Sequence, residues 1–196
     1  MSNTSSKGTK KPSIYIDTCI ARDVTERRND VSIEILGRIE REGWSCKMSV
    51  FGLMELVDIE QESIFVNKRF FIEKHTLDQI ISSRRNRNLE EGDFEKCLQY
   101  IAQFQNKYSF VKLVGLDDGG WSLALVLASC SNLHASDVIH LVSAWQADCD
   151  VVVTNDTFFI NEAKRYLQKE GIWDKLRVCK PEDCYSVLAK MGYTNI

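Results

Sequence analysis

The sequence predicts an α/β protein with three layers, α/β/α, around a central parallel sheet of four to five strands. Short apolar runs such as Ser13–Ile16 and Val151–Thr154 are typical of parallel strands that are buried on both faces. These runs alternate with stretches of helical periodicity, such as Val31–Glu42. Crossovers between parallel strands are right-handed, so the carboxyl ends of the strands gather at one edge of the sheet, where ligands bind in open α/β folds.

In the first sixty residues, local signals mark where two helices end and begin. Gly43 is suited to end one helix, because glycine readily adopts the left-handed backbone of a helix C-terminus. Ser49 can cap the next, whose start, Val50–Val57, is apolar on nearly all sides and is typical of a buried helix. The expected elements are a strand at 13–16, a polar loop at 21–30, a helix at 31–42, a strand at 44–48 and a helix from 50 to about 60.

Residues 62–106 are expected to form a helical hairpin inserted into the domain, because apolar residues recur at helical spacing on both of its arms. Its turn carries Arg84, Arg85 and Arg87. A charge cluster on an exposed hairpin is more often a solvated face than a binding site. The alternative is that these arginines contact RNA phosphates and position the strand.

The second half of the chain continues the alternation of strands and helices. Asp118 can cap one helix, and Pro181 suits the first position of the last helix. The expected elements are a strand at 110–116, helices at 121–128 and 135–147, a strand at 151–154, a helix ending near 169, a strand at 176–178 and a final helix.

Composition places the chain among soluble globular proteins. It has 196 residues, a net charge of −3 and 44% hydrophobic residues, and no stretch is long enough to span a membrane. The seven cysteines are scattered without a CxxC pair, which argues against a disulfide framework or a zinc site and favours the cytoplasm. No signal-peptide pattern opens the chain. We expect residues 1–12 to be a disordered tail and 13–196 to form a single domain.

Four acidic residues stand where a site could form. Asp17 and Asp156 each follow an apolar strand, Glu55 interrupts an apolar helix, and Asp137 lies in the first turn of another helix. Each has an ordinary alternative: a helix cap for Asp156, the helix dipole for Asp137, a surface edge or an ion pair for Glu55. Brought together, they would raise one another's pKa, and Mg²⁺ or Mn²⁺ would relieve the repulsion. His140 is taken as a satisfied core or rim residue without a role.

Five motifs follow one another in a recognisable order. They are Ile16-Asp17-Thr18, Ser49 with Glu55, Ala135 to Leu141, Val153 to Phe159, and Val178 to Asp183. Their order and their placement at strand ends resemble the PIN domain family over about residues 13 to 190. Two positions depart from the family pattern: Phe158 stands where many members carry a further acid, and Cys19 where Asn or Ser is frequent.

The resemblance implies a metal-dependent ribonuclease with Mg²⁺ or Mn²⁺ as cofactor. The family's acidic quartet would fall on Asp17, Glu55, Asp137 and Asp156, with Thr154 as the supporting hydroxyl residue. Asp17, Asp137 and Asp156 would bind one ion, and Glu55 a second ion or the attacking water. The hairpin resembles the clip helices of toxin-type members, which implies a homodimer and an antitoxin protein as partners.

Two other classes of function are the alternatives. A PIN-like chain that has lost turnover would serve as an RNA- or protein-binding module, which the acid missing at Phe158 and the acidic net charge would favour. A phosphatase of the haloacid dehalogenase type would need an acid two residues after Asp17, where Cys19 stands. A phosphorelay receiver would need an acidic pair near the first strand, which the sequence does not show.

Overall fold

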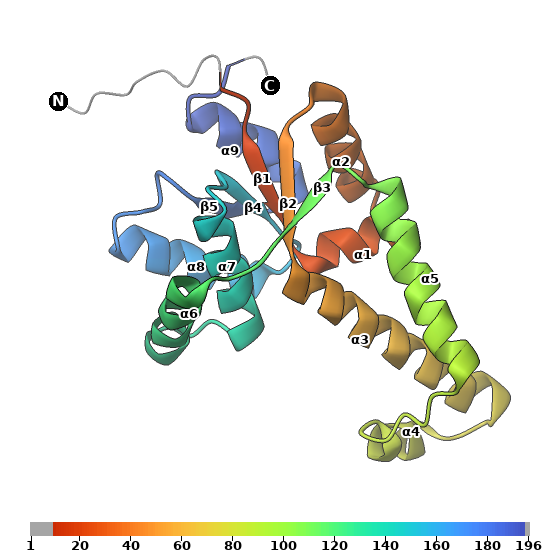
Figure 1. Cartoon of the computed structure of the whole chain (residues 1–196). Helices are drawn as coiled ribbons and strands as arrows, with labels where there is room; N and C mark the ends of the chain where they lie inside the picture. Colours follow the sequence, from red (N-terminus) through yellow and green to blue (C-terminus); the bar gives the residue numbers. More distant parts are fainter. Residues whose placement is uncertain (1–9, 195–196) are drawn as a thin grey trace. The chain divides into compact units, whose positions relative to one another are not determined.

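A computed structural model describes residues 10–194 of the chain. It contains a five-stranded parallel sheet in the order β3-β2-β1-β4-β5, with helices on both faces, which confirms the predicted α/β/α fold (Figure 1). The strands are β1 (Ser13–Ile16), β2 (Ser45–Ser49), β3 (Val111–Val114), β4 (Val151–Val153) and β5 (Arg177–Cys179).

The helices lie between the strands, as the alternating pattern predicts. The α-helices are α1 (Thr18–Glu26), α2 (Asp30–Glu42), α3 (Val50–Asn67), α4 (Leu77–Ser83), α5 (Glu91–Lys107), α6 (Asp118–Cys130), α7 (Ala135–Gln146), α8 (Thr157–Lys169) and α9 (Cys184–Lys190). A π-helical segment, η1 (Lys68–Ile72), follows α3, and a 3₁₀ turn, η2 (Pro181–Asp183), precedes α9.

The chain divides into two compact units. The first contains the whole sheet and is built from the described residues up to Gly52 and from Phe110 onward. The second is the helical segment Leu53–Ser109, which holds most of α3 together with η1, α4 and α5.

In the first unit, the sheet is buried between two layers of helices. Helices α6, α7 and α8 share one apolar core with the sheet, to which Tyr15, Val152 and Val178 contribute from three strands. On the other side α1 packs on α2, and the Arg38 guanidinium of α2 lies 4.4 Å from the ring centroid of Tyr185 in α9. Burial on both faces explains why the two central strands, β1 and β4, are almost wholly apolar.

The strand order changes direction between β1 and β4. From β1 the chain moves outward through β2 to β3, and then returns to the other side of β1 as β4 and β5. This change of direction is a topological switch point, where the crevice beyond the carboxyl ends of the strands is the usual ligand site of an open α/β sheet. Asp17 follows β1 at this point, and Thr154–Asp156 follow β4.

Two predicted segments of the first unit are wrong in detail. The loop expected at 21–30 is largely helix α1, because Asp17 accepts a hydrogen bond from the Thr18 N–H as its N-cap and Ile20 and Val24 pack into the core. The polar residues between those two apolar positions hide the helical stripe in the sequence. Asp117, and not Asp118, caps α6, since its carboxylate accepts from the Gly120 N–H at 2.7 Å.

The second unit also differs from the hairpin expected at 62–106. Helix α3 continues past residue 60 to Asn67 without a break, because no Gly or Pro stands between these two positions. The return arm, α5, lies within the predicted range, while the connection contains the separate short helix α4. Val50 and Met54 are exposed, so the start of α3 is not the fully buried helix that its composition suggests.

At the chain's beginning, the tail expected at 1–12 falls mostly outside the described residues. Lys11 and Pro12 are described and attach to the first unit: the Lys11 Nζ donates to the Glu42 carbonyl at 2.7 Å, and the Ser45 N–H donates to the Pro12 carbonyl at 3.2 Å. Among residues 10–194, no helix combines the length and the apolar character that crossing a membrane requires.

Gly43 provides a test of the backbone conformation that ends α2. Its φ of 60° lies in the left-handed region, so we expect Gly43→Ala to destabilise the protein by about 1 kcal/mol. The matched control is Gly37→Ala inside the same helix, which should stabilise by roughly 0.5–1 kcal/mol. Urea denaturation measures both changes, and an equal effect of the two substitutions would contradict the assignment.

Candidate functional site

Asp17 is the buried acid at the switch point, and two neighbouring elements fix its position. Its backbone N–H donates to the Val153 carbonyl at 3.1 Å, which extends the pairing of β1 with β4 by one residue. Its side chain is only 12% exposed and caps α1 through the Thr18 N–H at 2.6 Å. A carboxylate at this depth needs donors, because an unpaired buried charge is strongly unfavourable.

Four donors surround the Asp17 carboxylate. Oδ1 accepts from the Thr18 N–H and lies 3.3 Å from His140 Nε2. Oδ2 accepts from Thr154 Oγ1 at 2.7 Å and from the Cys19 thiol at 3.2 Å. A carboxylate has about four acceptor positions, so the protein itself fills those of Asp17.

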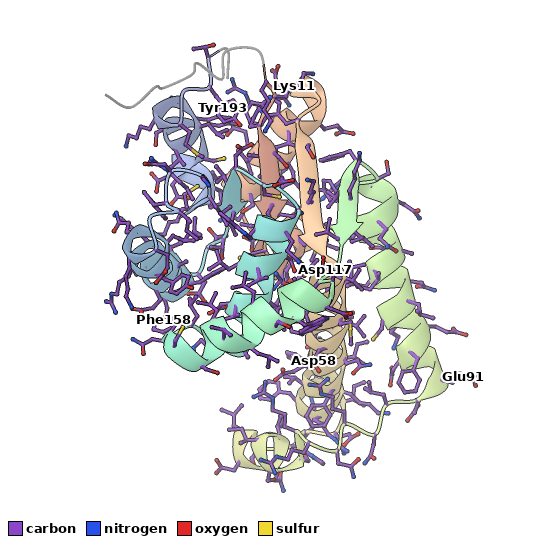
Figure 2. All side chains as sticks on the ribbon, turned by 60° about the vertical axis from the view of Figure 1, so that its left-hand side comes forward. Lys11, Asp58, Glu91, Asp117, Phe158 and Tyr193 are labelled. Atoms are coloured by element: carbon purple, nitrogen blue, oxygen red, sulfur yellow. The ribbon has the colours of Figure 1, made fainter. Side chains whose placement is uncertain are left out.

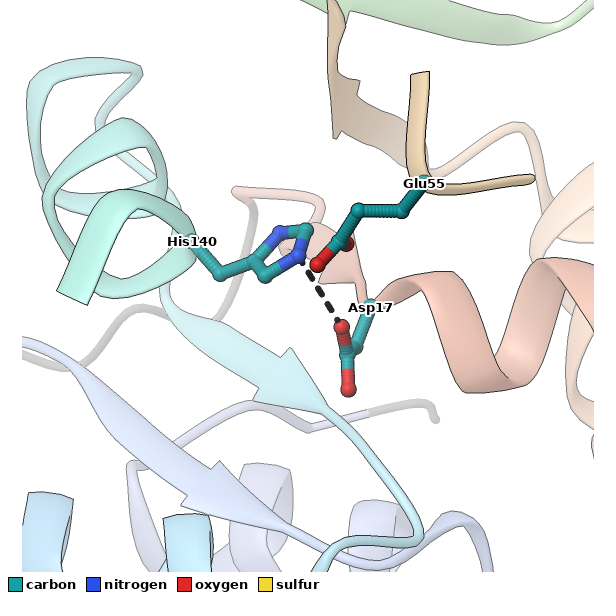
Figure 3. Close-up of side chains that lie close together, drawn as sticks. All are labelled: Asp17, Glu55 and His140. Carbon is teal, nitrogen blue, oxygen red and sulfur yellow. Dashed lines mark ion pairs between the residues drawn. The ribbon is translucent and has the colours of Figure 1, made fainter. Parts of the chain in front are cut away.

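His140 lies beside Asp17, on the opposite side from Thr154. Figure 3 draws the ion pair between His140 and Asp17, with Glu55 as the third side chain. The imidazole is 2% exposed, and the Phe51 ring packs edge-on against it with 5.8 Å between centroids. Its Nδ1 lies 2.8 Å from the hydroxyl oxygen of Tyr15.

The hydrogen bonds of Tyr15 fix which nitrogen of His140 carries the proton. The Tyr15 hydroxyl oxygen accepts from the Ser49 N–H at 3.1 Å, so its own proton is directed to His140 Nδ1. Burial raises the pKa of Tyr15, which keeps the phenol protonated. Nδ1 is therefore an acceptor, and Nε2 carries the hydrogen that is donated towards Asp17.

Cys19 and Asn155 complete the floor of the site. The Cys19 sulfur accepts from the Asn155 N–H at 3.2 Å, and burial, together with the nearby charge of Asp17, raises the pKa of the thiol. A protonated, enclosed thiol is a poor nucleophile and a poor metal ligand. The Asn155 side chain donates to the buried Asp23 at 2.6 Å, which anchors the loop after β4 to α1.

Asp137 is the acid that the protein leaves without a donor. Its Oδ2 is buried and has no hydrogen-bond partner among the described residues. Burial, together with the negative charges of Asp156 and Asp17, raises the pKa of Asp137 to about 6, while His134 and His140 oppose the shift. A buried, unpartnered carboxylate oxygen next to other acids is the feature that a bound cation would satisfy.

Asp156 approaches the same edge of the sheet from β4. It is exposed and caps α8, because its Oδ1 accepts from the Phe159 N–H at 2.9 Å. Its backbone N–H donates to Thr154 Oγ1 at 3.0 Å, the same hydroxyl that donates to Asp17. Thr154 thus links Asp156 to Asp17 through its hydroxyl group. Asp156 is both the cap of α8, which was its ordinary alternative, and a residue of the acidic edge.

Glu55 belongs to the second compact unit, which begins two residues before it on α3. The first turn of α3 belongs to the first unit and is capped by Ser49, whose Oγ accepts from the Gly52 N–H at 2.9 Å. A Cβ built on Gly52 would lie 3.1 Å from Thr18 Oγ1 and 3.3 Å from His140 Cε1, so this face of the turn meets both residues. Glu55, three residues further on, shares that face of the helix.

The three arginines predicted as RNA contacts lie in the second unit. Arg84 pairs with Glu62 at 2.6 Å, and Arg87 pairs with Asp58 at 2.7 Å. Both partners are on α3, so these two arginines hold the connection before α5 to that helix. Ion pairs of this kind are typical of a solvated helical surface. Contact of these arginines with RNA remains a prediction.

The structure therefore brings Asp17, Asp137, Asp156 and Thr154 to one edge of the sheet, as the strand ends predict. It adds His140, which the sequence analysis left without a role. Asp137 and His140 are three residues apart on α7 and share a helical face. This spacing in the sequence could have predicted that His140 lies at the site.

No protein-family model matches this sequence, and no curated protein is similar to it.

The raised pKa of Asp137 predicts how stability depends on pH in the metal-free protein. The folded state binds an extra proton between the ordinary carboxyl pKa of 3.8 and about 6, so stability falls as pH rises through this window. We expect Asp137→Asn to unfold at a higher temperature than the wild type above pH 6, and at the same temperature near pH 4. Thermal unfolding in EDTA measures this difference.

The control for this experiment is Asp174→Asn, which alters an acid whose side chain is 92% exposed. Its difference from the wild type should not change with pH. If the difference in unfolding temperature between Asp137→Asn and the wild type is constant across this pH range, Asp137 is not repelled by its neighbouring acids.

The tautomer of His140 is a second prediction. Nitrogen NMR of the wild type should show the proton on Nε2 and an unprotonated Nδ1. Tyr15→Phe removes the donor to Nδ1 and leaves the buried Ser49 N–H without its acceptor, which should cost about 1–3 kcal/mol and mix the two tautomers. A wild-type spectrum with the proton on Nδ1 would refute the assignment.

Proposed function

We propose that this chain is a metal-dependent endoribonuclease of the PIN-like kind, which hydrolyses RNA phosphodiester bonds with Mg²⁺ or Mn²⁺. The observation that carries the proposal is the buried Oδ2 of Asp137, which has no donor within residues 10–194 while the charges of Asp17 and Asp156 act on the same carboxyl group. Natural proteins rarely leave such a group unsatisfied, and the exceptions concentrate at functional sites.

The residues at this edge fit a hard divalent cation. Their donor atoms are carboxylate oxygens, which Mg²⁺ and Mn²⁺ prefer. We assign Asp137 and Asp156 as ligands, together with Asp17. When bound, the ion would lower the pKa of a coordinated water molecule and neutralise charge on the phosphate.

Glu55 is the proposed acceptor of a proton from the attacking water, or a ligand of a second ion. Glu55 lies on α3 in the second compact unit, and its role in this proposal is carried over from the family resemblance. The hydrogen on Nε2 of His140 argues against that nitrogen as a ligand. In the proposal, His140 instead holds Asp17 by donating to its Oδ1.

Hydrogen bonds from two neighbouring residues keep Asp17 in one orientation. Thr154 donates to Oδ2, and the Thr18 N–H donates to Oδ1 from the first turn of α1. Hydrogen bonds of this kind around a ligand typically change metal affinity or activity 10- to 100-fold. RNA as substrate, an antitoxin and a homodimer are carried over from the family resemblance.

One observation favours the second candidate function, a PIN-like binding module without turnover. All four acceptor positions of Asp17 are occupied by donors of the protein, so a metal ion must displace one of them. The Cys19 thiol is the weakest of these donors and is the group that an ion would displace. If it is not displaced, the site binds RNA but does not cleave it.

Cleavage of labelled RNA separates the two functions. With Mg²⁺ or Mn²⁺ we expect the wild type to cut the RNA, and Asp17→Asn and Asp137→Asn to be slower by at least about 100-fold, because each loses a proposed ligand. Asp174→Asn should cleave like the wild type. If the wild type binds RNA but a metal ion does not stimulate cleavage, the nuclease proposal is wrong and the binding module is supported.

A further inference from the structure

We propose that the rings of Phe158 and His134 form a stacking site for an unpaired nucleobase, beside the acidic edge. The two rings are in contact, with 5.2 Å between centroids and 39° between planes. Both residues are exposed. The inference rests on the proposed function, since it describes the part of an RNA that this edge would bind.

Phe158 is an aromatic side chain that the core does not use. Its ring is 44% exposed in the first turn of α8, and it lies at the surface of the molecule (Figure 2). The next residue, Phe159, is completely buried and makes the contacts with the apolar core. The helix therefore gains its packing from Phe159, and the open ring of Phe158 is available to a ligand.

The segment that carries His134 is fixed in place before any ligand binds. Leu133 is 6% exposed and belongs to the core between the helices, which anchors the residue just before His134. Asn132 Nδ2 lies 3.4 Å from Glu162 Oε2 on α8, four residues after Phe158. His134 is the N-cap residue of α7, but its side chain makes no capping hydrogen bond, so the ring is free to pack on Phe158.

Each of the two ring residues lies close in the sequence to an acid of the proposed site. His134 lies three residues before Asp137, and its charge acts on that carboxyl group. Phe158 lies two residues after Asp156, on the same first turn of α8. A nucleotide whose base rests on these rings would bring its phosphate towards the acidic edge.

Stacking suits this position because it does not depend on charge. The acids repel phosphate until a cation is bound, whereas every base has a π-face that an aromatic ring can contact. Base–aromatic stacking also requires a base that is not already stacked in a duplex. The site should therefore prefer single-stranded RNA or unpaired loops to double helices.

The test measures binding of a fluorescein-labelled oligoadenylate of about ten nucleotides, by fluorescence anisotropy in buffer with Ca²⁺. We expect Phe158→Leu and His134→Ala each to weaken binding about tenfold. Leucine keeps the apolar volume of residue 158 and removes the π-face. The matched control is Trp121→Leu, since Trp121 on α6 is 48% exposed, and this variant should bind like the wild type.

A second RNA of the same length, with abasic nucleotides, isolates the contribution of the base. Wild type, Phe158→Leu and His134→Ala should bind this RNA equally weakly. Equal affinity of Phe158→Leu and wild type for oligoadenylate would overturn the proposal, as would absence of wild-type binding. A change in oligomeric mass without a change in RNA affinity would also overturn it, because Phe158 would then be a contact between copies of the chain.

Failure of the stacking site and failure of the nuclease proposal give different results. If the wild type cleaves RNA and Phe158→Leu binds oligoadenylate normally, the nuclease proposal is supported and the stacking site is refuted. If cleavage is never seen but binding depends on Phe158 and on the presence of bases, the stacking site stands and the nuclease falls.

Discussion

The structure depends on a carboxylate that is buried at the point where the sheet changes direction. Asp17 is held there by the pairing of β1 with β4, which its own N–H continues to the Val153 carbonyl. Placing an ionised carboxyl group at this depth costs several kcal/mol unless donors meet it. Charge-assisted hydrogen bonds contribute roughly 1.5–3 kcal/mol each, so the group needs several of them. The neighbouring elements supply these donors, and this requirement explains much of their polar sequence.

The need for donors around Asp17 connects elements that are far apart in the sequence. Thr154 reaches it from the end of β4 and His140 from α7. Tyr15 of β1 contacts the imidazole, and its hydroxyl group accepts in turn from the Ser49 N–H of β2. A network with these connections fixes side-chain positions more strictly than apolar packing does. Asp137 lies at the same edge, and its buried Oδ2 has no donor in the part of the chain that the structure describes. The contrast between two acids so close in space is what points to a ligand, because selection for stability alone would pair both.

Sequence reasoning predicted the sheet and the convergence of acids, because both follow from local pattern and from the handedness of crossovers. The strands Val151–Val153 and Ser13–Ile16 are mostly apolar, so their burial could be predicted. The positions of Asp17 and Asp156 could be predicted because each acid follows the end of one of these strands. Helix α1 was missed because Arg22 and Asp23 interrupt its apolar stripe, and Asp23 is in fact buried by its contacts with Ser32 and Asn155. The role of His140 depends on a hydroxyl 125 residues away, which no local pattern reveals.

If the site binds the ion proposed above, the identity of residue 19 explains how it can be stable without the metal and still accept it. A serine there would give Asp17 Oδ2 a second strong O–H donor beside Thr154, and a cation would have to displace it. The thiol of Cys19 donates weakly, and its sulfur keeps a second contact with the Asn155 N–H, so turning the S–H away from Asp17 leaves the loop after β4 in place. The same oxygen can then pass from the thiol to an ion with little rearrangement. In the proposed metal site, Cys19 would therefore lower the barrier to metal entry without acting as a nucleophile or a ligand.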